Sequence, residues 1–304
     1  MPKSAGLIAD NVTATLVSLA VITSLKVKAR KRLKYATLVV FAVNSGGVSL
    51  ITGDVTTLMI FLAGKVSIGS LLLLILPSAF GVLVLAILLS LRMNRRVYFD
   101  TEIRHIDSKD KVIALIFLVT IISTLLLNVM FQVPPVLTFL FGLSTMFLIA
   151  HLMLRQESNR NVLNYIREIE FDTLLFFLGV LLIVGVLKEV GVLNKLTALY
   201  QFMPAELANY VLGISSALID NVPLTAALLK ANIDMGPAGW LAVTYSTGVG
   251  GSLLVIGSAA GIIAMSKVKE LNFISYGSMF AYLLLAYSIG YWLSVWVGGR
   301  LLTP

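Results

Sequence analysis

The stretch Ile219-Asp220-Asn221-Val222-Pro223-Leu224-Thr225 places a carboxylate, an amide and a proline in the middle of an apolar run. A similar pattern, Ala9-Asp10-Asn11-Val12-Thr13, stands near the start of the chain. An ionisable side chain in apolar surroundings is costly to keep, and it is by default a candidate functional residue. Two copies in one chain predict a duplicated transport unit with one polar tip in each half.

The composition is that of a membrane protein. Of the 304 residues, 58% are hydrophobic and 12% are charged, whereas soluble domains have about 45–50% and about 25%. Several apolar runs exceed the roughly 20 residues that a helix needs to cross a bilayer. The absence of cysteine excludes disulfides, thiolate catalysis and cysteine-ligated metals. The expected fold class is an all-α polytopic membrane protein.

The apolar segments differ in length and in their interruptions. Uninterrupted spans are expected at 68–91, 112–131, 135–154, 171–187 and 273–297. The two arms of the segment 205–231 are each too short to cross a bilayer, so they predict a re-entrant hairpin, and 12–25 predicts the second arm of another. Glycines interrupt the segments 35–64 and 238–265, which predicts two discontinuous helices.

The basic residues predict the orientation in the membrane. If the loop 26–34 is cytoplasmic, strict alternation also places the loops 92–111, 155–170 and 266–270 inside, and these four loops hold 17 of the 23 basic residues. The hairpin 205–231 then opens outward and the one at 12–25 opens inward, in the cytoplasmic membrane. The basic run 26–34 is interpreted as a retention signal that touches anionic lipid, and no nucleic acid is expected as a partner.

An internal repeat supports this layout. The dipeptide Asp10-Asn11 recurs as Asp220-Asn221, 210 residues later. A glycine triplet recurs with the same spacing at an offset of 204 residues, as Gly46, Gly47 and Gly53 and again as Gly250, Gly251 and Gly257. Polar motifs in the same order at nearly one offset predict two repeats of inverted topology, each with a hairpin and a discontinuous helix.

The repeats divide the chain into three parts. Residues 1–91 hold the remainder of the first repeat, 92–111 form a cytoplasmic loop, and 112–304 hold the second repeat with its scaffold spans. The first repeat lacks the arm and the spans that precede the motif in the second repeat. We therefore expect a truncated product, or one piece of a split protein with a separate N-terminal partner chain.

Three carboxylates, Asp10, Asp54 and Asp220, stand beside helix breaks, whereas the other acidic residues lie in loops or at segment ends. Irregular backbone at membrane depth is tolerated only where it is buried in protein or lines a cavity. Oxygen ligands suit a small hard cation better than a soft metal. Burial disfavours the charged form of a carboxyl group, so the same group could exchange a proton for a cation. We therefore expect an Na⁺ site drawn from these three carboxylates.

Hydroxyl, amide and glycine residues near the breaks complete the candidate site. These ion- and proton-binding candidates are Asn11, Thr13, Asn44, Thr56, Thr57, Ser216, Asn221, Gly250, Gly251 and Ser258. For a single serine or threonine among them, close packing of helices is the simpler role.

The ordered motifs resemble those of NhaD-type sodium/proton antiporters, which belong to the ion transporter superfamily and are related to citrate and arsenite carriers. The motifs are Ala9-Asp-Asn-Val-Thr13, Asn44-Ser-Gly-Gly47, Thr52-Gly-Asp-Val-Thr-Thr57, Asp220-Asn-Val-Pro-Leu-Thr225 and Gly248-Val-Gly-Gly-Ser252. The resemblance covers essentially the whole chain. It implies two inverted repeats whose hairpins and discontinuous helices meet at the middle of the membrane.

The resemblance also implies roles for the candidate residues. Asp10 and Asn11 would form the inward tip, and Asp220 and Asn221 the outward tip. The first discontinuous helix would supply Asn44, Asp54, Thr56 and Thr57, and the second would supply Gly250, Gly251 and Ser258, with Ser258 in the place of Asp54. Family members carry further spans before the first hairpin.

The expected function is secondary exchange of Na⁺ or Li⁺ for H⁺ by alternating access, with the aspartates competing for cation and proton. Expected partners are these ions, membrane lipid and either a second copy in a homodimer or the separate chain. The protein is not expected to be an enzyme or to need a cofactor.

Three alternatives remain. The first is an anion or carboxylate carrier of the citrate or arsenite type, which three carboxylates at the middle of the membrane disfavour. The second is an inactive fragment. The third is an intramembrane aspartyl protease, which is disfavoured because Ile51-Thr52-Gly53 precedes Asp54 in place of a Gly-x-Gly signature.

Overall fold

The computed structural model describes residues 11–25, 27–91, 135–154, 198–231 and 233–302, with scattered positions in 112–133 and 175–195. Asp10 and the predicted loops 92–111 and 155–170 lie outside the described residues. The chain divides into two compact units, one of Met1–Asp100 with Leu175–Pro304 and one of Thr101–Leu174. Every regular element in the described ranges is a helix, so the all-α class is confirmed.

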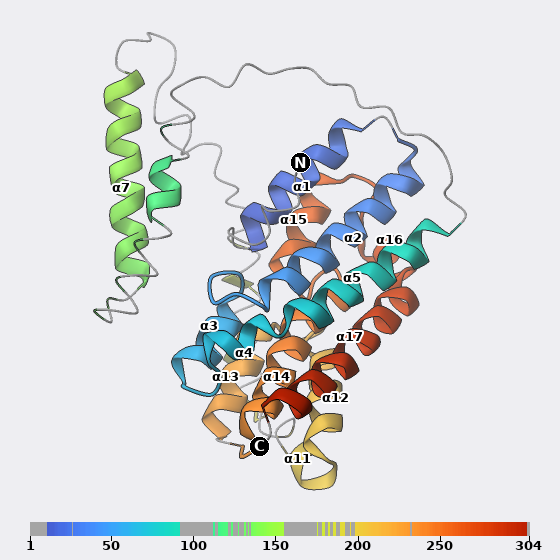
Figure 1. The fold of residues 1–304 in the computed structure, drawn as a ribbon. Coiled ribbons are helices and arrows are strands. Elements are labelled where there is room, and N and C mark those ends of the chain that lie inside the picture. Colours follow the sequence, from blue (N-terminus) through green and yellow to red (C-terminus); the bar gives the residue numbers. More distant parts are fainter. Residues whose placement is uncertain are drawn as a thin grey trace. The chain divides into compact units, whose positions relative to one another are not determined.

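The first unit holds most of the described helices (Figure 1). In its N-terminal part they are α1 (Asn11–Ser24), α2 (Ala29–Gly47), α3 (Val55–Leu62), α4 (Ile68–Leu72) and α5 (Ile75–Ser90). In its C-terminal part they are α11 (Leu199–Phe202), α12 (Ala205–Ser215), α13 (Asn221–Ala231), α14 (Gly236–Gly250), the 3₁₀ turn η2 (Gly251–Leu253), α15 (Ala259–Lys267), α16 (Phe273–Gly277) and α17 (Phe280–Leu301). The second unit contains α7 (Pro135–Leu154), which has the bounds of a predicted span.

Both segments with internal glycines are interrupted as predicted. The first holds α2 and α3, separated by residues 48–54, and the second holds α14 with η2 and then α15, separated by residues 254–258. The 205–231 segment forms two short helices, α12 and α13, joined by residues 216–220. The positions of the breaks therefore follow from the glycine and Asp-Asn motifs.

Two predicted spans are not continuous helices. Residues 73–74 separate α4 from α5, and residues 278–279 separate α16 from α17. The break at residues 73–74 has a local cause. Pro77 has no N–H group, so it cannot donate the helical hydrogen bond to the carbonyl group one turn earlier. Even so, two helical stretches of the described residues are long and apolar enough to cross a membrane, Ile68–Ser90 and Phe280–Leu301.

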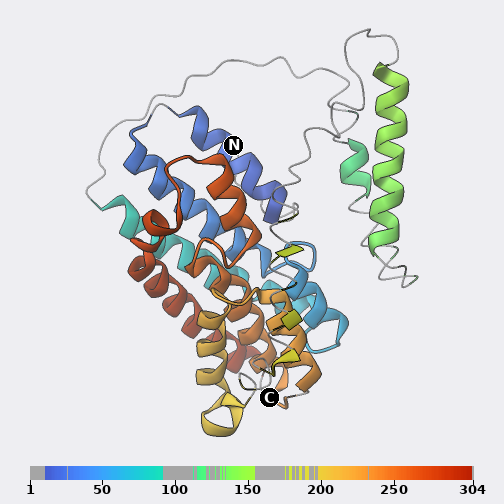
Figure 2. The ribbon, with the colours of Figure 1, turned by 180° about the vertical axis from the view of Figure 1, so that it is seen from behind.

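Helices that are distant in sequence lie side by side. α5 packs between α2 and α17 (Figure 1), and α15 lies beside α1, as the view from behind shows (Figure 2). Two segments that were both predicted to be cytoplasmic also meet, because Arg32 Nη1 lies 2.6 Å from Glu270 Oε1. The two parts of the sequence that carry the repeated motifs thus form one packed body.

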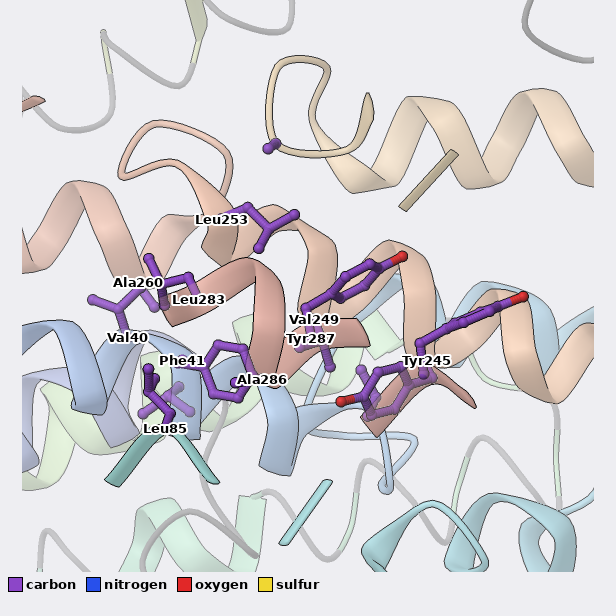
Figure 3. Packing of buried hydrophobic residues seen from close by; sticks show 14 of the residues in the cluster. Val40, Phe41, Leu85, Tyr245, Val249, Leu253, Ala260, Leu283, Ala286 and Tyr287 are labelled. Atoms are coloured by element: carbon purple, nitrogen blue, oxygen red, sulfur yellow. The ribbon is translucent and has the colours of Figure 1, made fainter. Parts of the chain in front are cut away.

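The core is built around α14, in which every residue from Trp240 to Gly250 is buried. Figure 3 shows Tyr245 and Val249 of this helix packed among side chains of α2, α5 and α17. The hydroxyls of Thr244 and Thr247 donate to carbonyls of their own helix, Trp240 O at 2.9 Å and Val243 O at 2.9 Å. Local bonds of this kind allow a helix with several hydroxyl side chains to be enclosed on all sides.

α12 and α14 approach each other so closely that their backbones touch. A Cβ atom on Gly250 would overlap the carbonyl oxygen of Gly213, and one on Gly213 would overlap the hydroxyl oxygen of Tyr287. The contact therefore depends on the absence of a side chain at both glycines.

We expect Tyr245→Phe to leave the melting temperature unchanged or to raise it slightly. The Tyr245 hydroxyl is buried and has no hydrogen-bond partner among the described residues, so its removal relieves an unsatisfied polar group. Tyr276→Phe is the matched control, because its hydroxyl donates to Ser252 O at 2.5 Å. Losing that bond should cost about 1–3 kcal/mol. Thermal unfolding in detergent measures both variants, and a large destabilisation by Tyr245→Phe would contradict this expectation.

Candidate functional site

The breaks in the helices meet at a single cavity in the first unit. Its volume is about 430 Å³, enough for several water molecules at about 30 Å³ each. The polar lining residues are Asn11, Asn44, Thr52, Asp54, Asp220, Asn221 and Ser258, and the others are Val12, Gly53, Val55, Val222, Ile256, Gly257, Ala259 and Ile262. Two of the lining residues, Asp54 and Asp220, are titratable.

Three helices begin at this cavity in the described part of the chain: α3 after Asp54, α13 after Asp220 and α15 after Ser258. A fourth helix, α1, contributes Asn11, the first of its described residues, to the wall. The N-terminus of a helix carries a partial positive charge and unpaired N–H groups. The carboxylates of Asp54 and Asp220 therefore lie at helix N-termini, where the helix dipole favours negative charge.

Asp54 uses its two carboxylate oxygens differently. It is the N-cap of α3 in an extended conformation, and its Oδ1 accepts hydrogen bonds from the backbone nitrogen and from Oγ1 of Thr56, each at 3.0 Å. Its Oδ2 faces two amides, with Asn221 Nδ2 at 3.3 Å and Asn11 Nδ2 at 3.5 Å. Oδ1 thus caps the first turn of α3, and Oδ2 is the oxygen near the amides of Asn11 and Asn221.

Ser258 stands at the corresponding position of the second break. It is the N-cap of α15 and its Oγ accepts from Gly261 N at 3.2 Å. The same oxygen accepts from Asn44 Nδ2 at 2.9 Å. Asn44 therefore connects the first break to the second, and its own Oδ1 points to the Asn11 amide, 3.4 Å away.

Asp220 caps α13. Its Oδ1 accepts from the backbone nitrogen of Val222 at 3.2 Å. This is the usual bond of an N-cap side chain, which satisfies one free N–H of the first turn. Asp220 is thus held at the cavity by the same local chemistry as Asp54.

Glycines make room for these side chains. A Cβ atom on Gly47 would lie 2.5 Å from Asn11 Oδ1, and one on Gly53 would lie 2.6 Å from Gly47 O. Any larger residue at Gly47 would push the Asn11 amide out of its place between the two breaks.

The structure brings six of the predicted site residues to the cavity wall: Asn11, Asn44, Asp54, Asp220, Asn221 and Ser258. Six others lie behind the wall or elsewhere in the unit. Thr56 bonds to Asp54, Thr57 Oγ1 donates to Val48 O at 3.4 Å, and Ser216 Oγ donates to Thr247 O at 2.8 Å. Thr13 and the pair Gly250 and Gly251 do not line the cavity, and Asp10 lies outside the described residues.

Sequence reasoning missed the apolar part of the wall. Three of these apolar residues directly follow a predicted polar residue: Val12, Val55 and Val222. Their position next to the motifs is a signal by which they could have been predicted. Ile256 and Ile262 come from the second break and from α15, and no pattern in the sequence distinguishes them from other apolar residues.

Comparison with known proteins identifies the family. A family model described as "Citrate transporter" matches residues 4–243. The chain belongs to this citrate transporter family. The sodium/proton antiporter NhaD of Alkalimonas amylolytica is 32% identical in an alignment 294 positions long, which covers 86% of this chain and 60% of the relative. NhaD of Vibrio cholerae is 31% identical in an alignment 313 positions long, gaps included, which covers 93% of this chain and 65% of the relative.

A plant relative, sodium/proton antiporter 1 of Arabidopsis thaliana, is 30% identical in an alignment 280 positions long, which covers 86% of this chain and 48% of the relative. The resemblance to NhaD-type antiporters is thereby confirmed. All three relatives are named as antiporters. The chain spans 60% and 65% of the length of the two bacterial relatives. No solved structure matches it.

Proposed function

We propose that the protein exchanges Na⁺ or Li⁺ for H⁺ across the cytoplasmic membrane by alternating access. The observation that carries this proposal is the position of Asp54, which lines the cavity at the first helix break, with its Oδ2 beside Asn221 at the start of α13. A cation or a proton at this oxygen neutralises the same charge, so each ion excludes the other.

The surrounding groups support a small hard cation as the ligand. Asn44, Asn11 and Asp220 offer amide and carboxylate oxygens, which suit Na⁺ or Li⁺. Asp10 would add a third carboxylate at the tip of the inward hairpin. A protonated Asp54 would also find acceptors in this set, so the same wall serves both transported ions.

The orientation of the protein follows the positive-inside pattern in this proposal. The repeats 1–91 and 112–304 are inverted and lie on either side of a cytoplasmic loop. The contact of Arg32 with Glu270 supports a common cytoplasmic side for the loops 26–34 and 266–270. The transported ions and lipid are the proposed partners, together with a second copy or a chain that supplies further spans.

The second candidate function is transport of a small carboxylate. Two observations favour it: the family model is described as "Citrate transporter", and the N-termini of α3, α13 and α15, which attract anions, lie at a cavity of about 430 Å³. Ionised Asp54 and Asp220 oppose it, because they would repel a dianion inside the cavity. We therefore rank cation exchange first.

Vesicle transport separates the two functions. The chain is reconstituted in proteoliposomes with an internal pH dye, and Na⁺, Li⁺, K⁺ or citrate is added outside. Cation exchange predicts proton movement with Na⁺ and Li⁺ but not with K⁺, and no uptake of labelled citrate. Uptake of citrate without cation-driven proton movement would overturn the proposal in favour of the second candidate.

A further inference from the structure

Gly248 lies in the buried part of α14, although glycine is less favourable than alanine inside a helix. A contact with the first break explains why no side chain is present there. A Cβ atom on Gly248 would overlap Cγ1 of Val48, and it would lie 3.4 Å from Oδ2 of Asp54. The missing side chain therefore leaves a notch in α14, and the side chain of Val48 fills this notch.

Val48 is held in the notch by its own position in the chain. It is the C-cap residue of α2, with φ −67° and ψ −18°, and it is fully buried. A β-branched side chain on helical backbone has one strongly preferred rotamer, so its methyl groups cannot easily turn away. The carbonyl oxygen of Val48 also accepts from Thr57 Oγ1 at 3.4 Å, which ties Val48 to the first turn of α3, the helix that Asp54 caps.

The pair formed by Val48 and Gly248 lies behind the wall of the cavity. Asp54 lines the cavity, and its Oδ2 is 3.3 Å from Nδ2 of Asn221, another lining residue. Val48 and Gly248 are both buried, and neither lines the cavity. Oδ2 of Asp54 thus has a polar side, toward the amide and the cavity, and an apolar side, toward the pair.

We propose that Val48 and Gly248 are positioning residues for Asp54, because together they close the space behind Oδ2 and leave this oxygen open to an ion only from the cavity. This inference rests on the proposed cation exchange. A water molecule behind Oδ2 would hydrogen-bond to the carboxylate, and hydrogen bonds to charged groups are among the strong ones. Such a water would compete with the transported cation. The pair therefore increases the affinity for the cation without touching it.

Moving one methyl group across the contact tests the inference. Val48→Ala removes both γ-methyl groups and frees a space on the scale of a water molecule, about 30 Å³. Gly248→Ala alone adds a methyl group that overlaps Val48. In the double variant the new methyl group would meet Cβ of residue 48 at 3.6 Å and Asp54 Oδ2 at 3.4 Å, which are ordinary contacts. The double variant therefore closes the space behind Oδ2 again, from the other helix.

The measurement is the initial rate of dye-reported proton movement in proteoliposomes, at one fixed pH and over a series of Na⁺ concentrations. Val48→Ala should raise the KM for Na⁺ about tenfold, the effect of one competing hydrogen bond to a charged group, with little change in the maximal rate. Gly248→Ala should also raise the KM, because the displaced Val48 pushes on the start of α3. The double variant should return the KM close to the wild-type value, as expected of two residues in contact.

Two further variants keep the test decisive. Val40→Ala removes the same two methyl groups about two turns earlier in α2, from the hydrophobic core and not from the cavity wall (Figure 3). It should lower the melting temperature and leave the KM unchanged. Val48→Thr keeps the shape of the side chain and brings a hydroxyl group beside the carboxylate, so it should raise the KM even if Val48→Ala does not fold.

The outcomes separate this inference from the proposed function. A wild-type KM in the folded Val48 variants would overturn the role of the pair and leave cation exchange standing. So would a double variant whose KM is no lower than that of Val48→Ala, a comparison that does not need Gly248→Ala to fold by itself. No Na⁺-dependent proton movement in the wild type would overturn cation exchange, and the role of the pair with it.

Discussion

Sodium-driven proton movement is expected to disappear when Asp54 is replaced by asparagine, while the protein stays folded. Asparagine keeps the size of the side chain, and it is as good an N-cap as aspartate. The start of α3 and the bond from Thr56 N should therefore survive. Only the charge at Oδ2 is lost, and with it the group that binds either ion.

The expected loss is about a hundredfold or more, because an interaction with a charged group contributes about 1.5–3 kcal/mol and every 1.4 kcal/mol is about a factor of ten. Dye-reported proton movement in proteoliposomes measures it, and gel filtration with thermal unfolding shows whether the variant is folded. Asp234→Asn is the matched control, since Asp234 is exposed and does not line the cavity that holds Asp54. Normal exchange by a folded Asp54→Asn protein would remove Asp54 from the mechanism.

Gly250→Ala is expected to prevent accumulation of folded protein. The added methyl group would meet the backbone carbonyl of Gly213, and backbone cannot rotate away as a side chain can. Relief requires α12 and α14 to separate, which opens the most enclosed part of the core. Such overpacking costs about 1–3 kcal/mol and sometimes more.

Gly299→Ala is the matched control for this substitution. Gly299 also lies in a helix, α17, but it is exposed and a Cβ atom there would have no neighbour within 4 Å. Alanine in a helix is favoured over glycine by about 1 kcal/mol, so this variant should be as stable as the wild type or more so. Gel filtration in detergent compares the yield of folded protein of the two variants, and a wild-type yield of both would contradict the Gly250 prediction.

The sequence was informative wherever a polar residue or a glycine interrupted an apolar segment. Asp54, Asp220, Asn44 and Ser258 could all be singled out as site candidates because side chains of this kind are unusual in apolar runs, and the structure places all four at one cavity. The glycine triplets indicated where the helices break, since glycine leaves room for close approach of the backbone.

Other features depend on contacts between residues that are distant in the sequence. Gly213 lies in an apolar run with no motif, so its contact with Gly250 could not be predicted. Ser216 stands beside the Asp220 motif, yet its hydroxyl bonds to Thr247 O instead of facing the cavity. The amide of Asn11 comes within reach of Asn44 and Asp54 only when α1 packs against α2.

The backbone contact between Gly213 and Gly250 also limits where the protein can bend. At this point no side chain separates the two backbones, and the Ser216 hydroxyl also bonds to Thr247 O at 2.8 Å, so we expect α12 and α14 to move as one rigid piece. Residues 216–220 follow α12 and residues 254–258 follow η2, and they end at Asp220 and Ser258. These two segments also touch, since a Cβ atom on Gly257 would lie 2.6 Å from Ala217 O. The residues that cap α13 and α15 should therefore shift together if the cavity opens.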